Sequence, residues 1–156
     1  PATVQLSDTA GSFVLGGQVY NPLTFDVPAL QAFTAHTETV TYLSGEDTVT
    51  TTFTGALLWD VLSASHPNVN DDQRGDKLSM FLVVTGADGY QAVISWGEID
   101  PEFAAVPILL AYAENDAPLA EGQGPVRLIV PTDGRGGRYV SVVSNISLRD
   151  APAVSR

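Results

Sequence analysis

The chain has 156 residues, long enough for one domain with a real hydrophobic core and too short for two domains of ordinary size. Hydrophobic residues make up 44% and charged residues 16%, which is typical of a globular protein, and no apolar run approaches the roughly 20 residues that span a bilayer. Seven basic against eighteen acidic residues give a net charge of −11, which repels nucleic-acid phosphates and anionic lipid surfaces. We therefore expect a single domain over residues 1–156, with no nucleic acid as a partner and no direct membrane insertion.

The first predicted elements are a hairpin and a short helix. Residues 12–25 (SFVLGGQVYNPLTF) alternate apolar and polar side chains around Gly16-Gly17, which predicts a hairpin that turns at the two glycines. Residues 26–33 (DVPALQAF) predict a short helix with Asp26 as its N-cap and a proline in its first turn.

A second hairpin and a second helix follow. Residues 37–43 (TETVTYL) and 48–54 (TVTTTFT) are rich in β-branched side chains and enclose the polar turn SGED at residues 44–47, which predicts two paired strands. Residues 54–65 (TGALLWDVLSAS) carry leucine and valine on one helical face, with Thr54 as the expected cap.

The middle of the chain contains a surface loop and the clearest hairpin signal. Residues 66–77 (HPNVNDDQRGDK) are polar and interrupted by Pro and Gly, as in a loop. Residues 78–95 (LSMFLVVTGADGYQAVIS) form an apolar run, a turn at Asp88-Gly89 and an alternating return strand. Residues 96–103 (WGEIDPEF) predict one further helical turn.

The last part of the chain reads as strands, over residues 106–114 (VPILLAYAE), 125–131 (PVRLIVP) and 137–150 (GRYVSVVSNISLRD). Together these elements predict an α+β fold that is mostly β, with mixed sheets and a few short helices.

The sequence contains no cysteine, which excludes disulfides, thiolate metal sites and thiol nucleophiles. His36 and His66 lie thirty residues apart and are interpreted as ordinary polar histidines, and no G-x-S-x-G nucleophile motif occurs. Any chemistry must therefore use hydroxyls, carboxylates, the two histidines or a bound cofactor.

The most suggestive local motif is PTDGRGGRYVS, residues 131–141. Its three glycines allow backbone N–H groups to turn inward around an anion, and Arg135 and Arg138 are two of seven basic residues in an acidic chain. A connection whose arginines balance nearby acids explains the motif equally well. Aromatic side chains in a β protein usually belong to the core, and Trp96 is the expected exception because it ends a strand beside Gly97.

Five phrases occur in an order that resembles the molybdopterin-binding domain of the sulfite oxidase family. They are LGGQVYNPLTFDVPALQAF, TFTGALLWDVL, FLVVTGADGYQAVISWGEID, PILLAYAENDAPLAEGQGPVRLIVP and GRGGRYVSVVSNISL. The resemblance covers about the whole chain and implies a sulfite-oxidase-like fold with a pterin-sized cleft.

In catalytic members of that family, the strand after the first helix ends in a cysteine whose sulfur binds molybdenum. The matching stretch here is TVTYLSGED, where Tyr42, Leu43 and Ser44 supply no thiolate. Catalytic relatives also tend to carry a basic residue and a tryptophan where this chain has Ser141 and Val142. The resemblance therefore points to the branch without the cysteine, whose small exported members look like binders of a reduced pterin without metal.

This resemblance places the expected ligand contacts around the cleft. Carboxylates would accept hydrogen bonds from the guanidine-like edge of a pterin, aromatic rings would stack on it, and the loop arginines would contact its tail. The candidate binding residues are Tyr42, Ser44, Glu46, Asp88, Tyr90, Trp96, Glu98, Arg135, Arg138 and Tyr139.

The sequence thus favours a non-catalytic binding protein for a pterin or related heterocycle, with pterin as ligand and no molybdenum, acting as a sensor for a membrane signalling partner. A molybdopterin-dependent oxidoreductase with non-cysteine ligation and an interaction module with a vestigial cleft are the alternatives. The start PATVQLSDTAG has no initiator Met, which suits either an exported protein whose signal has been removed or a trimmed fragment. The acidic, Lys-poor composition favours export, so we expect a periplasmic or secreted protein.

Overall fold

Two β-sheets share one hydrophobic core in the computed structural model, which describes residues 3–7 and 11–155. The described strands are β1 (Phe13–Gly17), β2 (Leu23–Phe25), β3 (Ala35–Ser44), β4 (Asp47–Leu57), β5 (Met80–Gly86), β6 (Gln91–Ser95), β7 (Leu109–Glu114), β8 (Ala117–Pro118), β9 (Arg127–Ile129) and β10 (Val143–Asp150). The helices are α1 (Val27–Gln31), α2 (Leu58–Ala64) and α3 (Trp96–Ile99), with 3-10 turns at Asp76–Ser79 and Gly136–Arg138. No helix among the described residues is long and apolar enough to cross a membrane.

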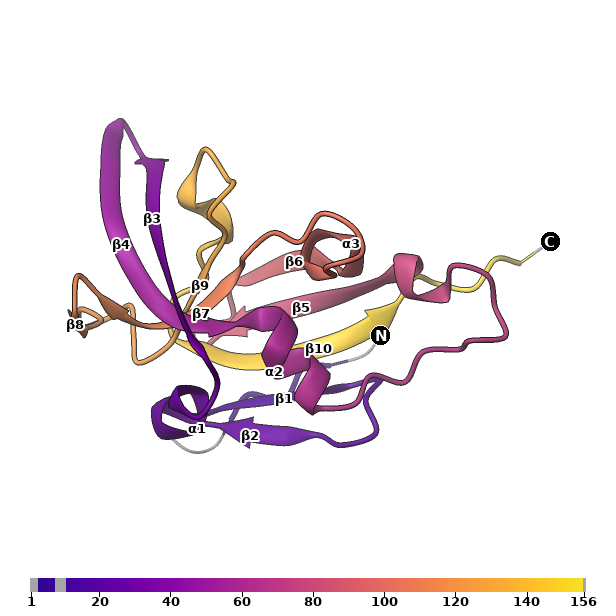
Figure 1. The fold of residues 1–156 in the computed structure, drawn as a ribbon. Helices are drawn as coiled ribbons and strands as arrows, with labels where there is room; N and C mark the ends of the chain where they lie inside the picture. The colour runs from indigo at the N-terminus through magenta and orange to yellow at the C-terminus, as the bar shows by residue number, and fades with distance from the viewer. Residues whose placement is uncertain (1–2, 8–10, 156) are drawn as a thin grey trace.

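The first sheet has the strand order β2-β1-β10-β5-β6 and joins the two ends of the chain. Strand β1 runs parallel to β10, and the other neighbours are antiparallel. Figure 1 shows β10 between β1 and β5, so the last strand fills the middle of a sheet begun by the first. Because a mixed sheet of this kind requires long-range pairing, local turn signals alone do not specify it.

The second sheet has the order β3-β4-β7-β8, with β9 paired to β7. Strands β3 and β4 form a long hairpin in continuous register from Ala35↔Ala56 to Ser44↔Asp47. In Figure 1 this hairpin rises away from the rest of the molecule, and the segment after β9 stands beside it. The polar turn predicted at residues 44–47 is confirmed.

The helices are short, and their ends follow local chemistry. Asp26 caps α1 by accepting a hydrogen bond from the N–H of Ala29, as predicted. A capping box begins α3, because Ser95 and Glu98 satisfy each other's backbone N–H groups. Helix α2 starts at Leu58 rather than after Thr54, which lies in β4, so the predicted cap is wrong.

Two further sequence expectations need correction. The first hairpin exists, but residues 18–22 connect its strands, whereas Gly16 and Gly17 lie within β1 and pair with Ser147 and Leu148 of β10. The strand expected from residue 137 begins only at Val143, because the residues before it form a 3-10 turn and an irregular link.

Candidate functional site

The loop at residues 131–139, called the glycine loop below, packs against the end of β3. The N–H of Leu43 donates to the carbonyl of Gly134 at 2.9 Å, and Leu43 and Arg135 form a parallel bridge. A Cβ added at Gly136 would come within 3.0 Å of the ring of Tyr42, so glycine permits this close approach. The neighbourhood where the resemblance expects a metal-binding sulfur, at Tyr42, Leu43 and Ser44, is thus packed against the chain's own loop.

Arg138 fixes the glycine loop to the first sheet. Its guanidinium holds Asp133 through two hydrogen bonds of 2.8 Å and reaches Glu98 at 3.0 Å. It also donates to the backbone carbonyl of Val93 on β6. These carboxylates raise the pKa of Arg138 well above its usual range, so the residue stays charged. Arg138 is therefore fully engaged within the protein, and the interpretation of the loop arginines as balancing nearby acids holds for this one.

Tyr42 of β3 packs against Tyr139, the last residue of the glycine loop, with ring centroids 4.6 Å apart. Both are predicted site residues. The guanidinium of Arg127 lies over the rings of Tyr139 and Phe53, at 5.5 and 5.9 Å. Among the described residues, the Nε of Arg127 and the hydroxyl of Tyr139 are buried without a hydrogen-bond partner. Burial raises the pKa of Tyr139 to about 12. These unpaired donors mark a place suited to an acceptor-rich group.

Trp96 is not the exposed aromatic that the sequence suggested. It is 5% exposed, packs edge-on against Trp59 and donates from its indole Nε1 to Asp100 at 2.7 Å. Burial alone would raise the pKa of Asp100, but bonds from the N–H of Glu102 and from Trp96, together with the charge of Lys77, lower it. The expectation that Trp96 faces a ligand is therefore corrected: its N–H is used within the core.

The remaining predicted residues serve local structure or face solvent. Asp88 accepts the N–H of Tyr90 in the β5–β6 turn, and the hydroxyl of Tyr90 donates to the carbonyl of Gly137. Ser44 and Glu46 are exposed at the β3–β4 turn. Of the ten predicted residues, six lie in or against the glycine loop, namely Tyr42, Tyr90, Glu98, Arg135, Arg138 and Tyr139.

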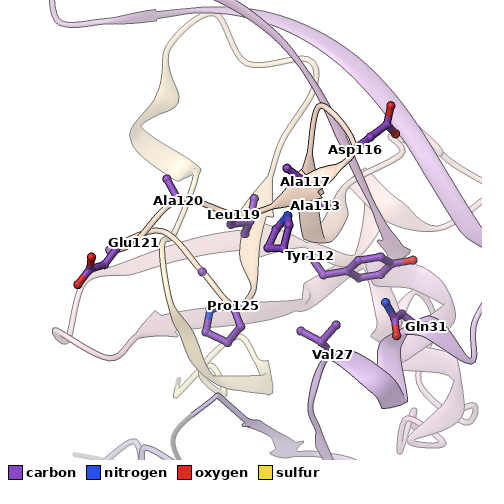
Figure 2. Close-up of a pocket in the computed structure, with 13 residues that line it drawn as sticks. Val27, Gln31, Tyr112, Ala113, Asp116, Ala117, Leu119, Ala120, Glu121 and Pro125 are labelled. Atoms are coloured by element: carbon purple, nitrogen blue, oxygen red, sulfur yellow. The ribbon is translucent and has the colours of Figure 1, made fainter.

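A separate hollow of about 560 Å³ lies between α1 and the segment from β7 to residue 125. Figure 2 shows Val27 of α1 facing Tyr112 and Leu119 across it, with Pro125 closing one side. Its size falls in the range of roughly 300–1,000 Å³ typical of small-molecule sites. None of the ten predicted residues lines this hollow.

Tyr112 reaches the hollow because β7 contains a bulge. Thr54 pairs with Ala113 and Gly55 pairs with Ala111, so Tyr112 is the extra residue between them. A bulge redirects one side chain relative to a regular strand, and such bulges are common beside functional sites. The sequence analysis missed this site, and an aromatic residue inside the phrase AYAENDAPL was its one local signal.

Polar groups stand at the edges of this apolar hollow. Gln31 of α1 supplies an amide that can both donate and accept hydrogen bonds. Asp116 lies in the β7–β8 turn, where it and Asn115 both have left-handed backbone angles, and Glu121 lies at another edge. Figure 2 shows these two carboxylates pointing outward from opposite sides. The hollow therefore offers an aromatic face, an amide and acidic rims.

The donor set does not suit a molybdenum centre of the thiolate kind. The chain has no cysteine, and no group of three His, Asp or Glu side chains among the described residues is arranged to hold a metal ion. An organic heterocycle fits better, because the hollow beside Tyr112 is apolar with hydrogen-bonding edges.

These features define a mostly β, two-sheet binding domain with a heterocycle-sized hollow. The chain belongs to the family described as the oxidoreductase molybdopterin binding domain, whose model matches residues 3–156. No curated protein sequence matches it.

Among solved structures, the chain is similar to the sulfane dehydrogenase SoxCD from Paracoccus pantotrophus. The TM-score is 0.73 at 19% sequence identity, over 95% of this chain and 40% of that chain. At this identity the likeness shows a shared fold. The family and the sulfite-oxidase-like fold predicted from the sequence are confirmed, while this chain spans less than half the length of that chain.

Proposed function

We propose that this protein is a non-catalytic binding protein for a pterin or a closely related flat heterocycle. The observation that carries the proposal is the hollow of about 560 Å³ beside the bulged Tyr112. A pterin needs a flat apolar slot and hydrogen-bonding groups for its amide and amino edge, with little charge.

Five side chains that line the hollow have definite roles in this proposal. Tyr112 stacks on one face of the heterocycle, with Leu119 beside it and Val27 against the other face. The amide of Gln31 pairs with the amide edge, because its oxygen accepts while its NH₂ group donates. Asp116 accepts hydrogen bonds from the amino group at the rim.

The absence of any cysteine supports binding rather than redox catalysis. A molybdopterin-dependent oxidoreductase with another metal ligand is the competing function, favoured by the family to which the chain belongs. Metal analysis of protein produced in a molybdenum-replete host separates the two, since stoichiometric molybdenum in the purified protein would reject the non-catalytic proposal.

Calorimetric titration of the protein with pterin and with tetrahydropterin tests the binding site. Aromatic stacking on a heterocyclic base contributes about 1–3 kcal/mol, so Tyr112→Ala should weaken binding by roughly 5- to 150-fold. Tyr112→Phe keeps the ring and should bind nearly as well. The matched control is Tyr90→Ala, which removes an exposed tyrosine at the glycine loop. Loss of binding in Tyr90→Ala but not in Tyr112→Ala would place the ligand at the end of β3 instead.

An exported location and a membrane signalling partner complete the proposal, and the family resemblance alone supports them. Fractionation of the producing cell tests the location, and recovery of the protein in the cytoplasm would contradict it.

A further inference from the structure

Strand β3 is an edge strand with an unusual surface. It lies at one end of the second sheet, so β4 pairs with one of its edges and no strand among those described pairs with the other. The strand is ten residues long, and its register with β4 has no shift. A long, regular and exposed edge offers unpaired N–H and C=O groups to any further strand.

The glycine loop identifies which residues point their backbone groups outward. The N–H of Leu43 bonds to Gly134 on the side away from β4. Because backbone groups alternate along a strand, Ala35, Thr37, Thr39 and Thr41 also direct theirs to the free edge. All four are exposed, and among the described residues no strand covers them.

The side chains of this edge already form a repeating pattern with β4. Thr37 pairs with Thr54, Thr39 with Thr52 and Thr41 with Thr50, with hydroxyl oxygens 3.1, 2.8 and 2.9 Å apart. Cross-strand threonine pairs stabilise a sheet, and Thr37, Thr39 and Thr41 can form the same kind of pair with a strand on the free edge of β3.

The edge lacks three of the features that commonly prevent strand pairing, namely lysine, proline and a bulge. Its titratable side chains are His36, Glu38 and the buried Tyr42. Natural edge strands usually carry lysine, proline or a bulge at such positions. This regular, threonine-rich edge therefore offers a pairing surface to a further strand.

We propose that a second copy of this chain pairs antiparallel along β3, with the two-fold axis at Thr37. In this register Thr37 faces its own counterpart, and Ala35 faces Thr39 of the second copy. His36 then lies opposite Glu38 of the second copy, and the same contact repeats across the axis. Opposite charges or a hydrogen-bonded pair directly across two strands are favourable.

The charges disfavour the two registers whose axes lie further along β3. An axis at Glu38 would place the two Glu38 carboxylates directly opposite each other, which is destabilising. An axis at Thr39 would leave Glu38 opposite Val40, a buried apolar residue, with no partner for its charge. Leu43 is bound by the glycine loop, so the pairing is limited to the part of β3 before it. The complementarity of His36 and Glu38 therefore favours a second copy paired about Thr37.

The association is expected to be weak and strengthened by salt. The proposed pairing buries only a short strand segment, so its buried surface area is well below the roughly 1,200 Å² of a stable interface. Each copy also carries a net charge of −11, and the repulsion is screened when the Debye length falls from about 8 Å at physiological ionic strength to about 3 Å at 1 M.

Single cysteines provide the test, because the chain has none of its own. Opposed residues of a hydrogen-bonded pair lie about 5.5 Å apart at their Cα atoms, within disulfide range, so Thr37→Cys should oxidise to a covalent dimer. In the same register the two copies of Thr39→Cys are displaced by about 14 Å along the strand and should not cross-link. Thr50→Cys, on the same face but on β4, controls for random collision.

Analytical ultracentrifugation of the full chain gives the second measurement. Thr37→Lys places two like charges at the axis and should weaken the dimer at least tenfold, whereas Thr50→Lys should leave it unchanged. Salt should strengthen the unmodified dimer. A monomer at all concentrations and salts, or cross-linking of Thr39→Cys in preference to Thr37→Cys, would overturn the proposed pairing.

Discussion

Replacement of Arg138 by alanine tests the idea that this side chain fastens the glycine loop to the first sheet. The guanidinium makes two hydrogen bonds to Asp133 and further bonds to Glu98 and the carbonyl of Val93. The alanine variant leaves two carboxylates without their cation and one carbonyl without its donor. The loop should then separate more readily from β6 and from the end of β3.

The expected loss is about 2 kcal/mol of unfolding free energy. Hydrogen bonds to charged groups contribute about 1.5–3 kcal/mol when well protected, while exposed ion pairs contribute about 0–1 kcal/mol. The side chains of Arg138, Glu98 and Asp133 are 32%, 28% and 22% exposed, between these limits. For a chain of this size, about 2 kcal/mol corresponds to a melting temperature lower by roughly 4–8 °C.

Urea unfolding measures this loss, with Arg135→Ala as the matched control. Arg135 lies in the same loop, is exposed and makes no ion pair among the described residues. Its replacement should change stability by less than about 0.5 kcal/mol. Hydrogen exchange of the Leu43 amide, which bonds to Gly134, should accelerate in Arg138→Ala alone. Equal effects of the two alanine variants would refute the fastening role.

Two further predictions concern packing and acid stability. Gly136→Ala should lower the free energy of unfolding by about 1–3 kcal/mol, because the added Cβ presses on the ring of Tyr42. Gly134→Ala should lower it little, because the added Cβ meets nothing within 4 Å. Equal shifts in melting temperature would contradict the close approach of Gly136 to Tyr42. The pKa of Asp100 is lowered from 3.8, so its charged form stabilises the fold at pH above that value and this contribution is lost as pH falls through the lower folded pKa. Asp100→Asn should therefore be less stable by about 1 kcal/mol at neutral pH, with the difference shrinking below about pH 4 in acid unfolding curves; a difference that persists at lower pH would refute the assignment.

Local patterns predicted the parts of the fold whose partners are close in sequence. The β5–β6 hairpin and the β3–β4 hairpin combine alternating residues with a polar turn, so both were found. The turn of the first hairpin was predicted at the wrong residues, because Gly17 is required for the close approach of β10. A Cβ there would lie 2.3 Å from the carbonyl of Leu148, so the glycine permits the parallel approach of β10 from the far end of the chain. That requirement is invisible in the local sequence.

The candidate site was predicted in part for a related reason. The glycine loop and its neighbours were recognised from composition, and the structure does bring Tyr42, Glu98, Arg138 and Tyr139 together there. Which face Tyr112 presents depends on the one-residue bulge between β4 and β7, and this register cannot be inferred from β7 alone. The partner of Trp96 also lies in its own helical turn, so its strand-end position gave a misleading signal of exposure.

The end of β3 and the hollow beside Tyr112 together suggest how the fold serves binding in this chain. At the end of β3, independent contacts close the position of the missing sulfur: the Leu43–Gly134 hydrogen bond, the approach of Gly136 to Tyr42, and the ion pairs of Arg138. The hollow, by contrast, has a volume of about 560 Å³, within the range of small-molecule sites. The proposed metal-free ligand beside Tyr112 therefore requires no opening of the packed end of β3.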